Sequence, residues 1–227
     1  MRYTAAAVAI ALLLTYQSKA QTTIQASRPT HYFYTPAPYV NEPYHLVIGL
    51  HEISFALPAN LQLQASLLDN IGRINLGAKY GIMDNMSVGA GLAHSLVHLG
   101  RGNHGIPNYA SPRLGVFFVY GFLMREKLES AFTLHTQIGE RVSAGIDFGL
   151  LARVHEVWSL IWEIGSSVDF EDELLYLNTD GGVRINPPSI PFLFFDFGID
   201  LEEFPVAEGA SPTVTAYIDV LFTMQVR

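Results

Sequence analysis

The sequence contains no cysteine and few charged residues. Of its 227 residues, 15% are charged and 49% are hydrophobic, whereas charged residues make up roughly 25% of ordinary soluble proteins. Without cysteine, an exported product is held together by its core and its backbone pairing instead of disulfide bonds. A lipoprotein is excluded too, because it needs a cysteine after its cleavage site. The low charge favours a membrane protein.

Long apolar runs are also missing. A helix that crosses a bilayer needs about 20 consecutive apolar residues, and only the N-terminus comes near this length. There, an apolar run over residues 5–14 follows Arg2, and Ser18 and Ala20 put small residues where a signal peptidase reads them. We therefore predict a signal peptide over residues 1–20. A retained anchor is the alternative, which the short run disfavours.

Basic residues are scarce as well. The chain has 13 Lys and Arg against 21 Asp and Glu, a formal net charge of −8. Loss of Arg2 and Lys19 with the signal peptide leaves 11 basic residues and a charge of −10 on the mature chain. Nucleic-acid binding requires clustered positive charge. Nucleic acid is therefore excluded as a partner.

Residues 21–44 contain four prolines among tyrosine and threonine. Proline cannot donate a hydrogen bond to a β-ladder, so this composition resists a regular central strand. We interpret residues 21–44 as a Pro/Tyr-rich periplasmic leader and residues 45–227 as the folded domain.

From residue 45 onward, apolar residues alternate with polar residues or glycine in segments of roughly ten residues. The clearest segment is 73–82, where Ile74 and Tyr80 share one face with other apolar residues, while Arg73 and Lys79 share the opposite face. A period of two places the two sets on opposite sides of a strand. Repetition of such segments is typical of a transmembrane β-barrel.

Eleven segments alternate in this way, and bacterial single-chain barrels have even strand numbers. Because segment 45–57 changes phase internally, we discount it and predict an all-β, antiparallel up-and-down transmembrane barrel of about 10 strands. Twelve is the alternative, if the leader supplies a strand. The C-terminal strand is expected to close the barrel against the first. The segments are 45–57, 61–69, 72–82, 86–98, 112–124, 128–138, 142–154, 157–169, 173–185, 192–202 and 212–226.

A periplasmic C-terminus would place short turns on the periplasmic side and longer loops outside, as is usual for these barrels. The predicted outer loops are 100–111 and 203–211. The predicted periplasmic turns are 83–85, 125–127, 155–156 and 186–191.

Residues 77–89 read GAKYGIMDNMSVG. This stretch resembles the KYGI-x-DN-x-SVG hairpin of an uncharacterised outer-membrane β-barrel family, similar to transporter-like phenol-degradation outer-membrane proteins. The resemblance covers one hairpin. It implies a barrel fold and the outer membrane of a Gram-negative bacterium, and it carries over no ligand or catalytic residue.

No pair of residues predicts catalysis. His94 and Ser95 are adjacent in a strand and therefore point to opposite faces. His135 can meet Asp147 on the next strand, a contact that we interpret as packing. His94 and His98 are about 13 Å apart at 3.3 Å per residue, too far to share one ion. We predict neither an enzyme nor a metal or other cofactor, and an outer-membrane hydrolase is the least favoured alternative.

The polar strand faces are predicted to fill the lumen with charged side chains. The barrel is then either a structural outer-membrane protein with a closed polar core or a narrow, cation-favouring small-solute channel with an acidic constriction. Adhesion through the outer loops is the alternative. Expected partners are outer-membrane lipid, the barrel-assembly machinery during insertion, and small solutes. The predicted lumen-lining residues are Arg73, Lys79, Glu129, His135, Asp147, Arg153, Glu163, Arg184, Asp196, Asp200 and Asp219.

Overall fold

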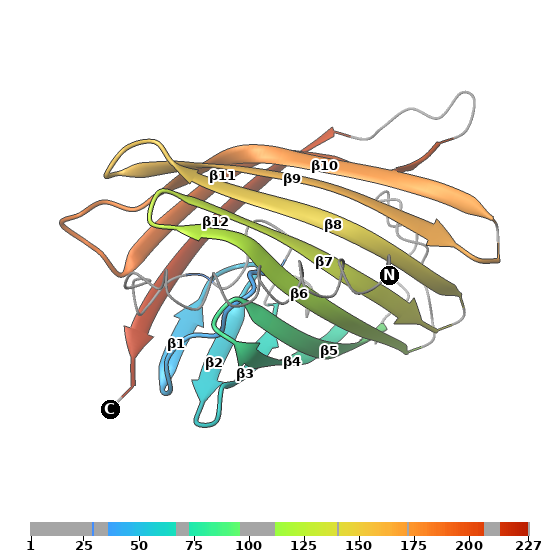
Figure 1. Cartoon of the computed structure of the whole chain (residues 1–227), viewed down its shortest axis with the longest axis horizontal. Coiled ribbons are helices and arrows are strands. Elements are labelled where there is room, and N and C mark those ends of the chain that lie inside the picture. The colour runs from blue at the N-terminus through green and yellow to red at the C-terminus, as the bar shows by residue number, and fades with distance from the viewer. Residues whose placement is uncertain are drawn as a thin grey trace, which may run out of the picture.

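The computed structural model describes residue 29 and residues 36–66, 73–95, 112–139, 141–171, 173–206 and 214–226. Within this part of the chain, the regular structure is twelve β-strands and no helix (Figure 1). They are β1 (His45–Ile48), β2 (Ile53–Leu57), β3 (Leu61–Ala65), β4 (Arg73–Met83), β5 (Met86–Ser95), β6 (Arg113–Arg125), β7 (Leu128–Ile138), β8 (Val142–Arg153), β9 (Trp158–Asp169), β10 (Leu174–Ile185), β11 (Leu193–Pro205) and β12 (Val214–Gln225).

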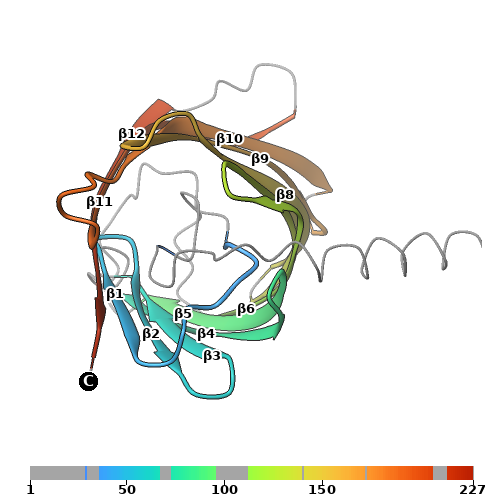
Figure 2. The ribbon, with the colours of Figure 1, turned by 60° about the vertical axis from the view of Figure 1, so that its left-hand side comes forward.

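The strands form one closed antiparallel barrel in which each strand pairs with its neighbours in sequence. Closure occurs between β12 and β1, with Leu46 opposite Met224 and Ile48 opposite Phe222. The predicted all-β, antiparallel up-and-down barrel, closed by its last strand against its first, is therefore confirmed. Figure 2 shows the ring of strands obliquely from one end. No helix among the described residues has the length and apolarity to span a membrane.

The preferred count of ten strands is corrected to twelve. Segment 45–57 is a hairpin of two short strands, β1 and β2, joined by a tight turn in which Gly49 N donates to Glu52 O over 2.6 Å. A turn resets the inward and outward alternation, so it accounts for the phase change in the sequence. The twelfth strand comes from this split and not from the leader.

The wall of the barrel is apolar outside and polar inside. On β12, the exposed side chains include Val214, Ile218 and Phe222, while Tyr217 and Asp219 are buried. Most of the other long strands repeat this alternation, whereas β6 places the apolar Phe117 and Val119 inside. The fully buried side chains include Lys79, Glu163 and Asp196. A soluble barrel has the opposite arrangement, with apolar side chains inside. This arrangement is consistent with a membrane barrel.

The strands β1, β2 and β3 have only 4, 5 and 5 residues, so β1 pairs with β12 only over residues 222–225. Where β1 leaves the wall, the Asp219 carboxylate accepts hydrogen bonds from the backbone N–H groups of Leu50 (2.7 Å), His51 (3.1 Å) and Val220 (2.7 Å). The His51 ring also stacks on Tyr217. Asp219 thus holds the β1–β2 turn against the inside of β12.

Candidate functional site

The candidate site is the lumen, which is lined by rows of side chains that follow the strand register. We use the C-terminal end, where β12 finishes and β1 begins, as the reference point. The first row that crosses all of β9–β12 is formed by the successive cross-strand partners Ser159, Arg184, Asp196 and Asp219. On β11 and β12 the buried pair of Phe194 and Leu221 lies nearer to the C-terminal end.

This first row contains a buried ion pair. Arg184 Nε donates to Asp196 Oδ1 over 2.8 Å, and Arg184 Nη2 donates to Asp196 Oδ2 over 2.6 Å. Both side chains are at least nine-tenths buried. These two hydrogen bonds between oppositely charged groups offset the free-energy cost of burying the charges. The Asp219 carboxylate accepts hydrogen bonds from backbone N–H groups, and the Asp196 carboxylate pairs with Arg184. Both neighbouring carboxylates of this row therefore have a stabilising partner.

The next row is apolar. Ile161 and Tyr217 form a buried cluster with Val119 and Ala131. These residues belong to β9, β12, β6 and β7, and β6 and β12 stand on opposite sides of the closed strand order. Phe117 packs against the same cluster. Apolar side chains from facing walls therefore meet inside the barrel.

Beyond the apolar row, further from the C-terminal end, lies an acidic row. Glu163 pairs with Asp180 across β9 and β10, and Asp180 pairs with Asp200 across β10 and β11. Glu163 and Asp180 are 2% and 3% exposed, and Asp200 accepts a hydrogen bond from Thr215 Oγ1 over 3.3 Å. Three carboxyl groups therefore stand side by side on the lumen face. We name these three residues the acidic row.

His135 and Asp147 meet on β7 and β8, with Nε2 and Oδ2 3.3 Å apart and both side chains about one-fifth exposed. Two glycines make room for them. A Cβ on Gly145 would collide with the His135 ring, and a Cβ on Gly165 would collide with the carboxylate of Asp147 and the amide oxygen of Asn178. The pair therefore lies flat against the wall.

The predicted lumen residues fall into four groups. Six are buried on the inner face: Lys79, Glu129, Glu163, Arg184, Asp196 and Asp219. Three are partly buried: His135, Asp147 and Asp200. Arg153 is exposed and lies at the rim of a cavity at the C-terminal end. The side chain of Arg73 lies outside the described residues.

The inner face holds polar residues that sequence reasoning missed. Asp180 shares the face of Arg184 four positions away, so the period of two in β10 could have found it. The alternation of Leu and Gln in β3 could likewise have found Gln62, whereas Glu52 lies in the β1–β2 turn, where no period is visible. Both are buried.

Residues 36–41, which the sequence assigned to the leader, lie inside the barrel. We call them the lumen segment. Ala37, Tyr39 and Asn41 are 1%, 7% and 8% exposed, and the segment runs through the interior of the ring in Figure 2. Tyr39 Oη donates to Pro29 O over 2.9 Å. Two stretches of the N-terminal region therefore meet in the lumen.

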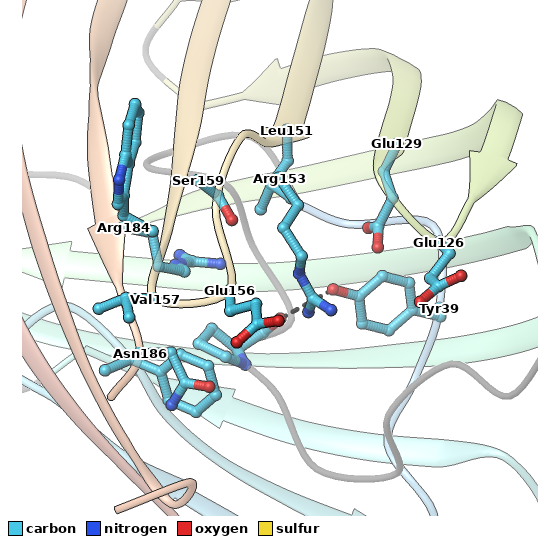
Figure 3. Close-up of a pocket in the computed structure, with 13 residues that line it drawn as sticks. Tyr39, Glu126, Glu129, Leu151, Arg153, Glu156, Val157, Ser159, Arg184 and Asn186 are labelled. Atoms are coloured by element: carbon cyan, nitrogen blue, oxygen red, sulfur yellow. Dashed lines mark hydrogen bonds between the residues drawn. The ribbon is translucent and has the colours of Figure 1, made fainter. Parts of the chain in front are cut away.

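A cavity remains between Tyr39 and the walls of β7–β10 (Figure 3). Its volume is about 40 Å³, whereas sites for small-molecule ligands usually measure roughly 300–1,000 Å³. Figure 3 shows Tyr39, Glu129, Arg153 and Arg184 around it. The space admits water but no larger solute while the lumen segment is in place.

Several sequence predictions fall outside the described residues. They concern residues 1–28, His98, the 100–111 loop and most of the 203–211 loop. The side chains of His94 and Ser95 are likewise not described.

Among described side chains, no group of three or more His, Asp or Glu is placed to hold a metal ion. The hairpin that resembles outer-membrane barrels is β4 and β5, with Met83 opposite Met86 at its turn.

Comparisons with known proteins identify no relative. No protein-family model matches the chain, and no curated protein matches it.

Proposed function

We propose that this chain is an outer-membrane β-barrel protein acting as a narrow small-solute channel, and that the described conformation is its closed state. The supporting surface is the belt of exposed apolar side chains, which suits contact with lipid. The predicted signal peptide and the barrel-assembly machinery would bring the chain to that membrane. The resemblance of residues 77–89 to outer-membrane hairpins agrees with this location.

The observation that carries the channel function is the acidic row. The three carboxyl groups contact one another. Like charges directly opposite each other on neighbouring strands destabilise a sheet, and burying charged groups costs free energy even where they are hydrogen-bonded. A barrel that serves only as a scaffold gains nothing from Glu163, Asp180 and Asp200 in one row. Rings and rows of carboxylates do favour cations in pores. The acidic row therefore supports a cation-favouring channel over a purely structural barrel.

Neutralising the acidic row should reduce cation selectivity. In planar bilayers with a salt gradient, the refolded wild-type protein is expected to show small channel events whose reversal potential has the sign of cation flow. The triple variant Glu163→Gln, Asp180→Asn, Asp200→Asn should move that potential toward zero, because the fixed negative charge at the constriction is lost.

Asp84→Asn is the matched control, since Asp84 lies in the exposed β4–β5 turn outside the lumen. It should leave the reversal potential unchanged. A triple variant with wild-type selectivity would contradict the assignment of the constriction to this row. Complete absence of channel events, in the wild type and in the variants of the lumen segment described below, would contradict the channel itself.

A further inference from the structure

The lumen segment spans the barrel between opposite walls. Val40 lies against Gly81 on β4, while Tyr39 faces Arg184 on β10 across the small cavity. β4 and β10 stand six places apart in the ring of twelve strands. A segment that reaches both walls obstructs the passage between them.

The fit of the segment depends on two glycines of the wall. A Cβ on Gly81 would lie 3.0 Å from Val40 Cγ2. A Cβ on Gly121 of β6 would lie 2.8 Å from the Pro38 ring and 2.7 Å from Sδ of Met124, a flexible side chain of the same strand. Carbon atoms at their preferred contact distance are about 3.5–4.0 Å apart. Any larger residue at either position would therefore push against the seated segment.

Apart from a single β-bridge at Pro36, the segment takes no part in the strand pairs of the barrel. Its polar contacts with the wall include Lys79 Nζ to Ala37 O at 3.4 Å and Asn41 N to Gln62 Oε1 at 3.3 Å, both long for hydrogen bonds. Pro36 and Pro38 have no N–H to contribute. Its departure would leave every strand pair of the wall intact.

A fixed turn separates the segment from β1. Tyr44 has a φ of 67°, a left-handed conformation that is costly for a residue with a side chain. Its N–H donates to Ala56 O over 2.7 Å, and its carbonyl accepts from Val226 N over 2.8 Å. Tyr44 is thus held by β2 and by the end of β12. Residues on its N-terminal side can change position while β1 stays paired.

We infer that the lumen segment is a displaceable gate, which closes the channel when seated against Gly81 and Gly121 and opens it when it leaves them. This inference rests on the proposed channel function. It adds the regulation of that channel, and it assigns residues 36–41 a part in the closed state beside the apolar row of the wall.

A disulfide between the segment and the wall tests the gate. The pair Val40→Cys and Gly81→Cys suits a disulfide, because a Cβ at residue 81 lies 3.0 Å from a γ-position of residue 40 and bonded cysteines have Cβ atoms roughly 3.5–4.5 Å apart. The chain has no cysteine to compete. Under oxidising conditions, with the bond verified by mass spectrometry, channel events should fall at least tenfold. Reductant should restore them, and each single variant should not respond to oxidant.

The opposite change should release the gate. Gly121→Val places bulk against Pro38, whereas Gly115→Val on the same strand is the control, since a Cβ there meets nothing closer than a backbone oxygen at 3.9 Å. Combined with Val40→Cys, the Gly121 variant should raise the rate of labelling by a charged, membrane-impermeant thiol reagent at least tenfold. It should also raise channel-open probability. The Gly115 variant should change neither.

The two readouts separate the gate from the channel. If labelling in the Gly121 variant matches that of the Val40→Cys single variant, and conductance in the Gly121 and oxidised disulfide variants matches the wild type while wild-type channel events persist, the gate is wrong. The channel then stands. If labelling rises and no variant ever conducts, the segment moves but does not gate a channel. That second outcome overturns both the gating inference and the proposed channel function.

Discussion

Replacing Asp196 by alanine is expected to lower the free energy of unfolding of the barrel by about 3–5 kcal/mol. The carboxylate is fully buried and makes both strong hydrogen bonds to the Arg184 guanidinium. Removing it leaves an uncompensated buried charge, which costs far more than the net contribution of the intact pair. The pair is held on adjacent strands, so the loss would fall on the β10–β11 interface.

Unfolding in urea from detergent micelles, followed by tryptophan fluorescence, would measure this loss. Both tryptophans of the chain, Trp158 and Trp162, lie on β9 beside β10. Arg153→Ala is the control, because an exposed side chain usually changes stability by less than about 0.5 kcal/mol. The double variant Arg184→Met, Asp196→Leu should recover most of the loss. An Asp196→Ala barrel within about 1 kcal/mol of the wild type would show that Arg184 is not confined as described.

Arginine on the outer face of β8 should also destabilise the barrel, and by an amount that depends on depth. Ile146 is 48% exposed in mid-strand, and Val142 is 38% exposed at the strand end. In a membrane, Ile146→Arg is expected to cost about 2–4 kcal/mol and Val142→Arg about 0–1 kcal/mol. The difference arises because arginine near the rim reaches water and headgroups.

The same urea titration, performed on protein folded into lipid vesicles, measures both variants. They share a strand and a face and both replace a β-branched residue, so differences in β-propensity are small in the comparison. Equal, near-zero costs at the two positions would mean that water covers the outer face of β8 at mid-strand. The membrane assignment would then be wrong.

Strand alternation could be read from the sequence because it is a local property. The predicted segment 128–138 coincides with β7, and 142–154 exceeds β8 by one residue. Each of these strands has one face toward the lumen and one face outward. Successive residues therefore alternate between the two faces, and this alternation is visible in the sequence. The phase change in 45–57 was a further signal, and its cause was the turn at Gly49–Glu52.

Register between strands and the course of the lumen segment could not be read in this way. The adjacency of Glu163, Asp180 and Asp200 depends on the offset of three strands, and a bulge between Leu177 and Thr179 helps to set it. The lumen segment has no period at all. Its position depends on the absence of side chains at Gly81 and Gly121, which are far from it in sequence.

The most direct test of the central claim, a membrane-spanning barrel with an apolar exterior and a polar lumen, uses single cysteines on β8. Ile146→Cys and Ser143→Cys put one thiol on each face of a chain that otherwise has none. With a fluorescent label and vesicles, the label at residue 146 should be quenched by nitroxide lipids and protected from iodide, while the label at residue 143 shows the reverse. Quenching of the residue 146 label by iodide and not by nitroxide lipids would contradict the membrane barrel.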